Sequence, residues 1–398
     1  MSPESQKLAA ESEVVRRPLR IAQVATLWES VPPKGYGGTE RNVSYLTEEL
    51  VRRGHQVTLF ASGDSATSAK LFAGCERSLR LTNLAGVGVA IHHRMLSRVY
   101  ERASQFDVIH AHLDYWSFPF ARLVGTPSVT TIHGRLDIPE LHFIYRNYRE
   151  TPLVSISEAQ RKPLPEMNWV ATIYHGLARD LLKFNSEGGE YLAFLGRISP
   201  EKGIEAAIEV SRKTGIPLKI AAKVDDFDRE YYRNVIVPLL AQPGIEYIGE
   251  IDDSQKSDFL GKAIAVLFPI DWPEPFGMVM IESLACGTPL IARPLGAVAE
   301  VLRDGVTGFI APDVDGMVAA VRNIASLSRR RCREEFESRF TIDGVADQYE
   351  AIYRGEIAKE KSRAAATGGV RANSVEGATA APDPAKKNGV TAATSEDD

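Results

Sequence analysis

Cysteine is scarce in this sequence of 398 residues, and the three present, Cys75, Cys286 and Cys332, lie far apart. Their spacing fits neither a metal-binding motif nor a disulfide framework, so a reducing compartment is expected. Hydrophobic runs such as AIAVLFPI are far too short to span a bilayer. Residues 1–17 have no apolar core and are not expected to act as a signal peptide. The expected location is the cytoplasm, with peripheral association at the inner membrane surface left open.

The sequence also lacks any strong excess of basic residues. Its net charge of −5 gives no reason to expect nucleic acid as a partner. The hydrophobic content of 44% and the charged content of 25% are typical of a globular protein. A chain of this length is expected to form about two domains.

Strand-like segments alternate with helical ones in two successive series. The first series comprises residues 19–26, 56–61, 106–112, 128–134 and 153–157, and the second comprises residues 190–197, 217–224, 245–251, 263–270 and 288–294. Strands that alternate with helices predict a parallel, doubly wound sheet in each half.

The restart of this pattern predicts the domain boundaries. Residues 18–178 form the first α/β domain and residues 186–340 the second, after a flexible N-terminal segment over 1–17. An amphipathic helix is predicted over 341–361. Residues 362–398 contain no aromatic residue, leucine or isoleucine, so they cannot bury a core and are predicted to be disordered.

The stretch DWPEPFGMVMIESLACGTPLI, residues 271–291, carries two glutamates beside a predicted helix N-terminus. Pro273 and Pro275 forbid helix at its start, so Glu274 is expected in a loop and Glu282 about five residues inside the helix. Helix N-termini bind anions. The pair therefore fits hydroxyl groups on both sides of a diphosphate, as in a nucleotide-sugar, although two surface glutamates would give the same spacing.

Two further stretches combine glycine or cationic residues with a strand end. In FLGRISPEKG, Arg197 and Lys202 follow a strand of the second half, at the edge where α/β sheets bind ligands. An arginine fork and a lysine charge suit a phosphate clamp, or they are two solvated cations. In PPKGYGGTE, the dinucleotide-binding fingerprint fails, but Gly37 and Gly38 would let the backbone approach a phosphate or sugar.

Histidines follow two strands of the first half. His110, His112 and Asp114 have the His-x-His-x-Asp spacing of some metallohydrolases, without an evident further ligand. His133 ends a separate strand at the ligand-binding edge, where a lone histidine is either functional or a hydrogen-bonded structural residue.

Taken in order, these motifs resemble those of the retaining glycosyltransferases of family 4 (glycosyl transferases group 1), which have the GT-B fold. The resemblance covers residues 19–360 and includes YGGTE, FDVIHAH, TIHG and DGVTGFIAP besides the Glu274–Glu282 spacing and LGRISPEKG. It implies two Rossmann-like doubly wound domains facing across a cleft, with the donor mainly on the second and the acceptor mainly on the first. The last helix would cross back to the first domain.

The resemblance also assigns roles to matching positions. Arg197 and Lys202 would hold the donor diphosphate and stabilise it as it leaves, Glu282 would bind the ribose, and Glu274 the donor sugar. His133 would assist the reacting centre by hydrogen bonding. Backbone contacts to the sugar and phosphates are implied for Gly37, Gly38, Phe276, Gly277, Met278 and Val279.

The implied activity is hexosyl transfer from a nucleoside-diphosphate sugar, expected to be UDP-linked and glucose-like, to an acceptor hydroxyl with retained configuration. No metal or other cofactor is implied, and the acceptor could be a saccharide, a small molecule or lipid-linked. Two alternatives remain open. One is a GT-B enzyme that does not transfer, such as a nucleotide-sugar epimerase, and the other is a zinc hydrolase using His110, His112 and Asp114.

Overall fold

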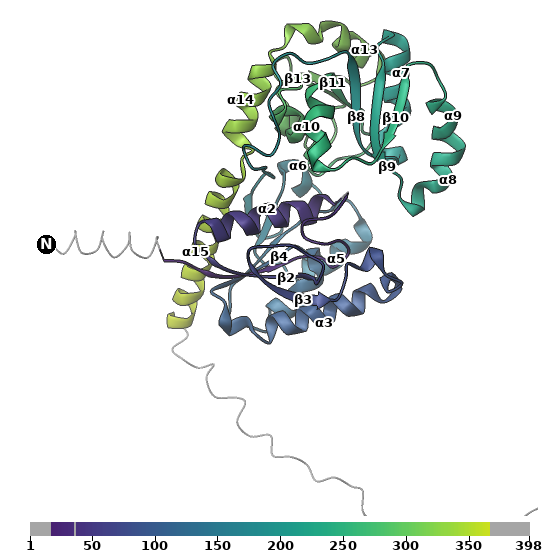
Figure 1. Cartoon of the computed structure of the whole chain (residues 1–398). Coiled ribbons are helices and arrows are strands. Elements are labelled where there is room, and N and C mark those ends of the chain that lie inside the picture. Colours follow the sequence, from purple (N-terminus) through teal and green to yellow (C-terminus); the bar gives the residue numbers. More distant parts are fainter. Residues whose placement is uncertain (1–16, 36, 367–398) are drawn as a thin grey trace, which may run out of the picture.

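A computed structural model describes residues 17–35 and 37–366, and these form two halves, each built around one parallel sheet (Figure 1). The seven-stranded sheet has the order β3-β2-β1-β4-β5-β6-β7, and the six-stranded sheet the order β10-β9-β8-β11-β12-β13. Every neighbouring pair in these two sheets runs parallel. The expected fold of two doubly wound, Rossmann-like halves is confirmed.

The bounds of the elements follow the chain. The strands are β1 (Arg20–Val24), β2 (Gln56–Ser62), β3 (Lys70–Cys75), β4 (Val108–Ala111), β5 (Ser128–Thr131), β6 (Leu153–Ser155), β7 (Trp169–Thr172), β8 (Tyr191–Arg197), β9 (Leu218–Lys223), β10 (Ile245–Gly249), β11 (Ala263–Phe268), β12 (Leu290–Ala292) and β13 (Gly308–Ile310). The α-helices are α2 (Gly38–Arg52), α3 (Gly88–Tyr100), α4 (Phe118–Ala121), α5 (His142–Asn147), α6 (Glu158–Arg161), α7 (Ile204–Thr214), α8 (Arg229–Tyr231), α9 (Val237–Leu240), α10 (Asp253–Gly261), α11 (Met278–Ala285), α12 (Val298–Val301), α13 (Val314–Asn323), α14 (Arg329–Arg339) and α15 (Ile342–Ala366).

Each expected strand overlaps a strand of the structure, but β3, β7 and β13 were not expected. All three lie at an edge of their sheet. Strand β7 is half-buried along its whole length, and β3 buries one of its six residues. A continuous apolar run in the sequence identifies an inner strand, which is buried on both faces. These edge strands are less covered and lack such a run, so the pattern did not reveal them.

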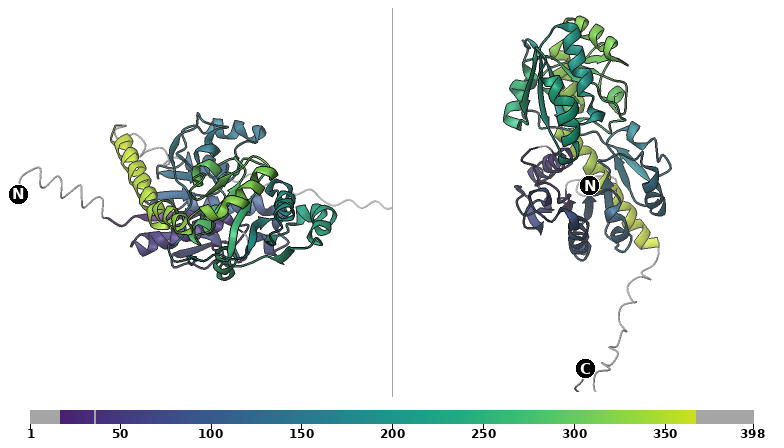
Figure 2. Two further views of the ribbon diagram at one scale, coloured as in Figure 1. Left: turned by 90° about the horizontal axis from the view of Figure 1, so that it is seen from above. Right: turned by 90° about the vertical axis from the view of Figure 1, so that its right-hand side faces the viewer.

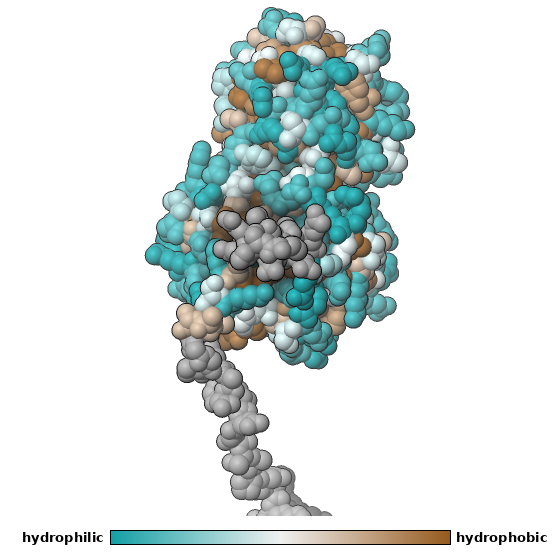
Figure 3. Space-filling model, turned by 90° about the vertical axis from the view of Figure 1, so that its left-hand side faces the viewer, coloured by the Kyte–Doolittle hydropathy of each residue, from teal (hydrophilic) through white to brown (hydrophobic). Residues whose placement is uncertain are grey.

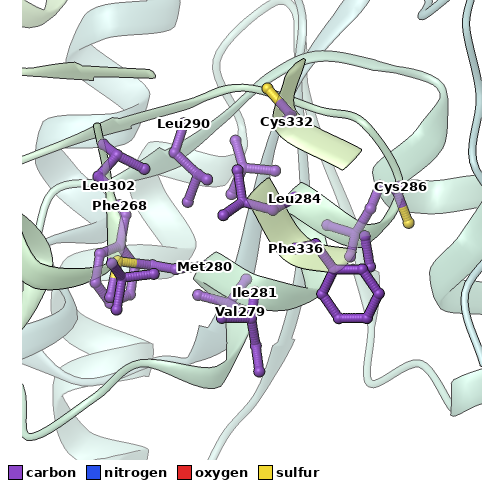
Figure 4. Packing of buried hydrophobic residues seen from close by; sticks show 14 of the residues in the cluster. Phe268, Val279, Met280, Ile281, Leu284, Cys286, Leu290, Leu302, Cys332 and Phe336 are labelled. Atoms are coloured by element: carbon purple, nitrogen blue, oxygen red, sulfur yellow. The ribbon is translucent and has the colours of Figure 1, made fainter. Parts of the chain in front are cut away.

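The core of the second half fixes helix α11, which carries Glu282. Its apolar side chains, including Met280, Ile281 and Leu284, pack with Phe268 of β11 and Phe336 of α14 in one buried cluster (Figure 4). A helix held on most of its surface by close packing has a fixed position and direction. The polar groups at its N-terminus are therefore held in place by the core behind them.

Helix α15 returns to the first half, as expected (Figure 2). Val345, Tyr349 and Tyr353 join the buried cluster that contains Ile21 of β1 and Leu50 of α2. Just before the helix, backbone hydrogen bonds of 2.9 Å join Leu177 to the residues on either side of Thr341. Helix α15 therefore packs into the core of the first domain.

The predicted end of this helix is too early. Residues 362–366 continue α15, because arginine and alanine are strong helix formers that need no packing partner. The rest of the expected tail, residues 367–398, and residues 1–16 of the expected flexible N-terminus lie outside the described residues.

Hydrophilic residues predominate on the face shown in Figure 3, and hydrophobic ones gather only in small groups. Within the described part of the chain, no helix has both the length and the apolar character needed to cross a membrane.

Candidate active site

A cleft with a volume of about 440 Å³ lies between the two halves and is lined by residues of both. This volume lies in the range typical of small-molecule sites. From the first half, the lining includes the segment after β1, the start of α2, and His133 after β5. From the second half, it includes the ends of β8 and β9, Lys202, and the segment from Glu274 to Glu282. The carboxyl ends of strands from both sheets thus face one another, and this is the edge where open α/β sheets bind ligands.

The structure brings most of the predicted site residues together here. The cleft is lined by Gly37, Gly38, His133, Lys202, Glu274, Phe276, Gly277, Met278, Val279 and Glu282. Of the predicted site residues, all within the described chain, Arg197 alone is not part of this lining. Its guanidinium faces Glu201, Asp225 at 3.5 Å and Asp228 at 3.7 Å. The guanidinium of Arg197 is thus engaged by carboxylates beside the cleft lining.

Lys202 is held at the cleft by Glu274 and by the aromatic ring of Trp272. Its ammonium forms an ion pair with Glu274 and lies 4.9 Å from the centre of the Trp272 ring. The Trp272 indole N–H donates to the same carboxylate at 2.9 Å. The turn that carries Lys202 ends at Gly203, where φ is 68° and a Cβ atom would lie 2.1 Å from the carbonyl oxygen of Pro269. Only glycine fits this turn, and it fixes where the lysine side chain begins.

Helix α11 begins at the floor of the cleft. Gly277 precedes it with φ of 82°, a conformation that glycine adopts without strain. The first amides of a helix have no partner within the helix and carry partial positive charge. Lys202 lines the same cleft as residues 277–279 at the start of this helix. The second half therefore presents a cation and a helix N-terminus to one ligand.

The loop that carries Glu274 is locked by close backbone contact. The amide of Ala297 donates to the carbonyl of Glu274 at 2.9 Å. A Cβ atom at Gly296 would lie 2.1 Å from that same carbonyl oxygen, so a larger residue would push the loop away. Glu274 and Glu282, 9% and 5% exposed, are both too buried to be the ordinary surface glutamates of the alternative interpretation.

Glu282 lies within a chain of charges that joins the two halves. Lys256 of α10 contacts Glu282 at 2.6 Å and Asp253 at 3.1 Å. Burial alone would lower the pKa of Lys256, but the charge of Glu282, the charge of Asp253 and the hydrogen bond to Glu282 together outweigh burial, and the pKa is raised. Asp253 in turn forms an ion pair with Arg41 of α2, whose other guanidinium nitrogen donates to the carbonyl of Gly35 at 2.7 Å. The glycine loop over the cleft is thereby tied to the helix beside Glu282.

The first half adds histidines to a lining that also includes its acidic and basic residues Glu29, Glu40, Arg41 and Arg80. His133 stacks on His175 with ring centres 5.3 Å apart, and His175 meets the edge of Phe276 across the cleft at 5.0 Å. Burial lowers the pKa of His133 to about 3 and that of His175 well below its usual value. Both rings are therefore neutral hydrogen-bonding groups at physiological pH.

The geometry does not support the zinc hydrolase alternative. Both ring nitrogens of His110 are hydrogen-bonded, to Tyr353 and Thr131, at 2.7 Å each. Those of His112 bond to Gln23 and His133, at 2.8 Å each. Over residues 17–35 and 37–366, no group of three or more histidine, cysteine or acidic side chains is arranged to hold a metal ion.

Several residues of the site were not found from the sequence. Lys256 lies on α10 and Arg41 on α2, and no local pattern in these helices distinguishes a site lysine or arginine from a surface one. His175, which follows β7, also lines the cleft.

Comparison with known proteins agrees with this geometry. Residues 36–187 match the family described as Glycosyltransferase Family 4, and residues 182–339 match Glycosyl transferases group 1. The chain is 25% identical to the glycogen synthase of Mycobacterium tuberculosis (strain ATCC 25618 / H37Rv) over 404 residues, which cover 85% of this chain and 96% of that protein. It is 27% identical over 343 residues to the phosphatidyl-myo-inositol mannosyltransferase of Propionibacterium freudenreichii subsp. shermanii, with 76% and 84% covered.

The fold is shared with solved structures as well. The Anabaena protein HepE in complex with UDP-glucose matches with a TM-score of 0.66 at 15% identity, covering 87% of this chain and 100% of that one. The two family matches meet between the two sheets and together cover every strand of both sheets except β1. The chain therefore belongs to the family 4 glycosyltransferases (group 1), and it is a glycosyltransferase with the GT-B fold.

Proposed function

We propose that this enzyme transfers a hexosyl group from a nucleoside-diphosphate sugar, UDP-glucose or a close relative, to an acceptor hydroxyl with retention of anomeric configuration. The observation that carries the proposal is the cleft floor, where Lys202, the N-terminus of α11, Glu274 and Glu282 surround one space. A relative in fold, HepE, holds UDP-glucose. A diphosphate between a cation and a helix N-terminus, with a carboxylate on either side, matches this arrangement of charge.

Each group then has a role in the proposed reaction. Lys202 and the first amides of α11 bind the diphosphate, and Glu282 accepts hydrogen bonds from the ribose hydroxyls. Glu274 accepts from a hydroxyl of the donor sugar, and the backbone near Gly37 and Gly38 approaches the phosphates. Arg197 joins the clamp only after releasing its carboxylates, so Lys202 supplies the larger part of the contact.

The reaction is proposed to proceed on one face of the sugar. The bond between the anomeric carbon and the diphosphate oxygen breaks, and the acceptor oxygen forms its new bond on the same side. The departing phosphate takes the proton of the acceptor hydroxyl. Negative charge grows on the diphosphate as it leaves, so Lys202 and the helix N-terminus stabilise the transition state more than the ground state.

His133 contributes hydrogen bonding, because its low pKa leaves it neutral and no proton transfer through an imidazolium is needed. The glutamates serve as hydrogen-bond acceptors and are not a glycosidase acid/base pair. They lie on opposite sides of the helix start, with Glu274 held by Lys202 and Glu282 held by Lys256.

The test is a screen of nucleotide-sugars for slow hydrolysis by the purified enzyme, followed by assays with added acceptor alcohols and saccharides. We expect release of UDP from UDP-glucose or a close relative, faster with acceptor, and an α-linked product from an α-linked donor. Interconversion of sugar epimers without an acceptor would identify the epimerase alternative. Failure to bind or turn over every nucleotide-sugar in the screen would contradict the proposal.

A further inference from the structure

A continuous chain of hydrogen bonds runs through the core of the first half to the cleft. Its members come from three strands, the loops that follow them, and helix α15. In order from the helix, they are Tyr349, Thr131, His110, Tyr353, Gln23, His112 and His133. The successive distances are 2.9, 2.7, 2.7, 3.1, 2.8 and 2.8 Å. His133 is the member of this chain that lines the cleft.

Each link near the cleft has a fixed direction. The Gln23 side-chain oxygen can only accept, so His112 donates to it from Nε2. Burial lowers the pKa of His112 well below its usual value, so the ring is neutral and its Nδ1 is an acceptor. That nitrogen must then receive the Nε2–H of His133. The remaining nitrogen of His133, Nδ1, is left with a lone pair.

The amide of Gln23 is itself oriented by α15. Its nitrogen donates to the Tyr353 hydroxyl, and this hydroxyl donates onward to Nδ1 of His110. Tyr353 is fully buried, with its ring in the cluster that anchors α15 to the first domain. A polar group at such a position needs a partner, and Gln23 and His110 provide two. Through Tyr353, helix α15 therefore influences the orientation of His133 at the cleft.

Nδ1 of His133 is buried, and it has no hydrogen-bond partner among the residues that the structure describes. A buried acceptor without a partner is costly and uncommon, so it marks a place where a ligand donor fits. The ring is held by stacking on His175 on one side and by His112 on the other. A hydroxyl group of a bound sugar could donate the missing hydrogen bond to Nδ1 of His133.

We propose that Gln23 and Tyr353 are positioning residues that hold His133 in its Nε2–H form, so that Nδ1 accepts a hydrogen bond from a hydroxyl of the bound substrate. The substrate part of this inference rests on the proposed function, and the orientation part does not. Neither Gln23 nor Tyr353 touches the cleft, so both act through His112 and His133.

The test begins with the tautomer itself. Ring nitrogens of the eight histidines are labelled with ¹⁵N, and His133 is identified by loss of its signals in His133→Ala. The parent enzyme is expected to show a protonated Nε2 and an unprotonated Nδ1 at His133. In Gln23→Met, which keeps the side-chain length but removes the acceptor, His112 can place its proton on Nδ1. His133 must then shift toward the Nδ1–H form.

Tyr353→Phe keeps the buried ring and removes only the hydroxyl, so a smaller shift in the same direction is expected. Thr130→Val is the matched control. Thr130 is 1% exposed on β5 next to Thr131, but within the described chain its hydroxyl hydrogen-bonds only to that of Ser117. It should leave the His133 signals unchanged. Unfolding midpoints of all variants show whether each one still folds.

Turnover gives the second readout. We expect Gln23→Met to lower kcat with the best donor of the screen by roughly tenfold, the size of one net hydrogen bond, with little change in KM. An unchanged His133 tautomer in folded Gln23→Met would overturn the inference, as would an Nδ1–H form in the parent. A tautomer shift in a protein that turns over no nucleotide-sugar would uphold the orientation chain and reject the substrate role together with the proposed function.

Discussion

The two sides of the cleft differ in the side chains that they present. All eight histidines of the chain lie in the first half, and none lies between residues 176 and 398. There, neutral rings at His133 and His175 face the cleft. The second half instead presents paired charges, Lys202 with Glu274 and Lys256 with Glu282. We propose that these paired charges bind the diphosphate and that the two histidines orient hydroxyl groups without a change of charge, although the first half also lines the cleft with Arg41 and Arg80.

The two sides also differ in the contacts that hold their side chains in place. Lys202 and Lys256 are each held by a carboxylate, so the cationic groups are fixed before a diphosphate arrives. The histidines are fixed by one another and by Tyr353, through neutral hydrogen bonds. Charge substitutions should therefore affect donor binding and turnover, whereas acid should affect the first half.

The largest effect is expected at Lys202. Lys202→Ala should raise the barrier to sugar transfer by about 2–4 kcal/mol, because it removes a cation aimed at charge that grows in the transition state. The measurement is kcat at saturating donor. Lys213→Ala is the matched control, since Lys213 pairs with Asp315 on the surface of the same half. Equal turnover in both variants would show that Lys202 does not hold the diphosphate.

Glu282→Gln should weaken UDP binding by about 1.5–3 kcal/mol, the range for a hydrogen bond to a charged group. The amide keeps the shape but loses the charged acceptor for ribose and the partner of Lys256. Calorimetry with UDP measures the effect. Glu335→Gln serves as control, because Glu335 is equally buried and ion-paired, with Arg303 and Arg339, but lies outside the cleft lining. If both variants bind UDP like the parent, Glu282 has no part in the donor site.

Acid should destabilise the protein through its first half. Burial lowers the pKa of His92, His110, His112, His133 and His175, so below about pH 6.5 the unfolded chain binds protons that the folded chain does not. As the pH falls from 6.5 toward the folded pKa of such a histidine, that histidine lowers the free energy of unfolding by up to about 1.4 kcal/mol per pH unit.

Carboxyl groups whose pKa is raised by burial have the opposite effect on stability in acid, and they include Asp114, Glu29 and Asp228. Burial raises the pKa of Asp114 to about 6, so as the pH falls the folded chain binds a proton there at a higher pH than the unfolded chain does. This proton binding stabilises the folded chain and offsets the destabilisation that about one histidine causes. Urea denaturation at pH 7.5 and pH 5.5 measures the balance. We expect a lower midpoint at pH 5.5, and an equal or higher midpoint would contradict the account of the neutral rings.

The smallest effect is expected at Arg197. Arg197→Ala should lower turnover less than Lys202→Ala does, because its guanidinium faces three carboxylates and does not line the cleft. A double-mutant cycle sharpens the point. If both cations reach the same diphosphate, the two losses will not add, whereas independent losses would place Arg197 in a purely structural role. A larger loss at Arg197 than at Lys202 would reverse the proposed order of the two.

The same contrast decided what could be predicted from the sequence. The site of the second half lies largely in one continuous segment, where prolines, Gly277 and an apolar helix fix the positions of Glu274 and Glu282. Lys202 follows a strand end directly. Parallel sheets gather such strand ends at one edge, so topology alone brought these groups together.

The rest depended on contacts that no local pattern encodes. Gln23 and Tyr353 are 330 positions apart and read as ordinary members of a strand and a helix. Their contact exists because α15 packs on the first domain. Likewise, Arg197 occupies the expected strand end, but Asp225 and Asp228, supplied by a neighbouring turn, hold its guanidinium away from the cleft lining. Strand-end position indicates where a side chain begins and not which partner it finds.

The most direct test of the division between the two sides is calorimetric titration of UDP, which carries the diphosphate but no sugar, into the parent, Lys202→Ala and His133→Ala. The account predicts that Lys202→Ala weakens UDP binding by roughly tenfold or more, as expected for a charge-assisted contact. His133→Ala should bind UDP within about twofold of the parent, since its hydrogen bond is made to a sugar hydroxyl that UDP lacks. Equal weakening in both variants, or weakening in His133→Ala alone, would contradict it.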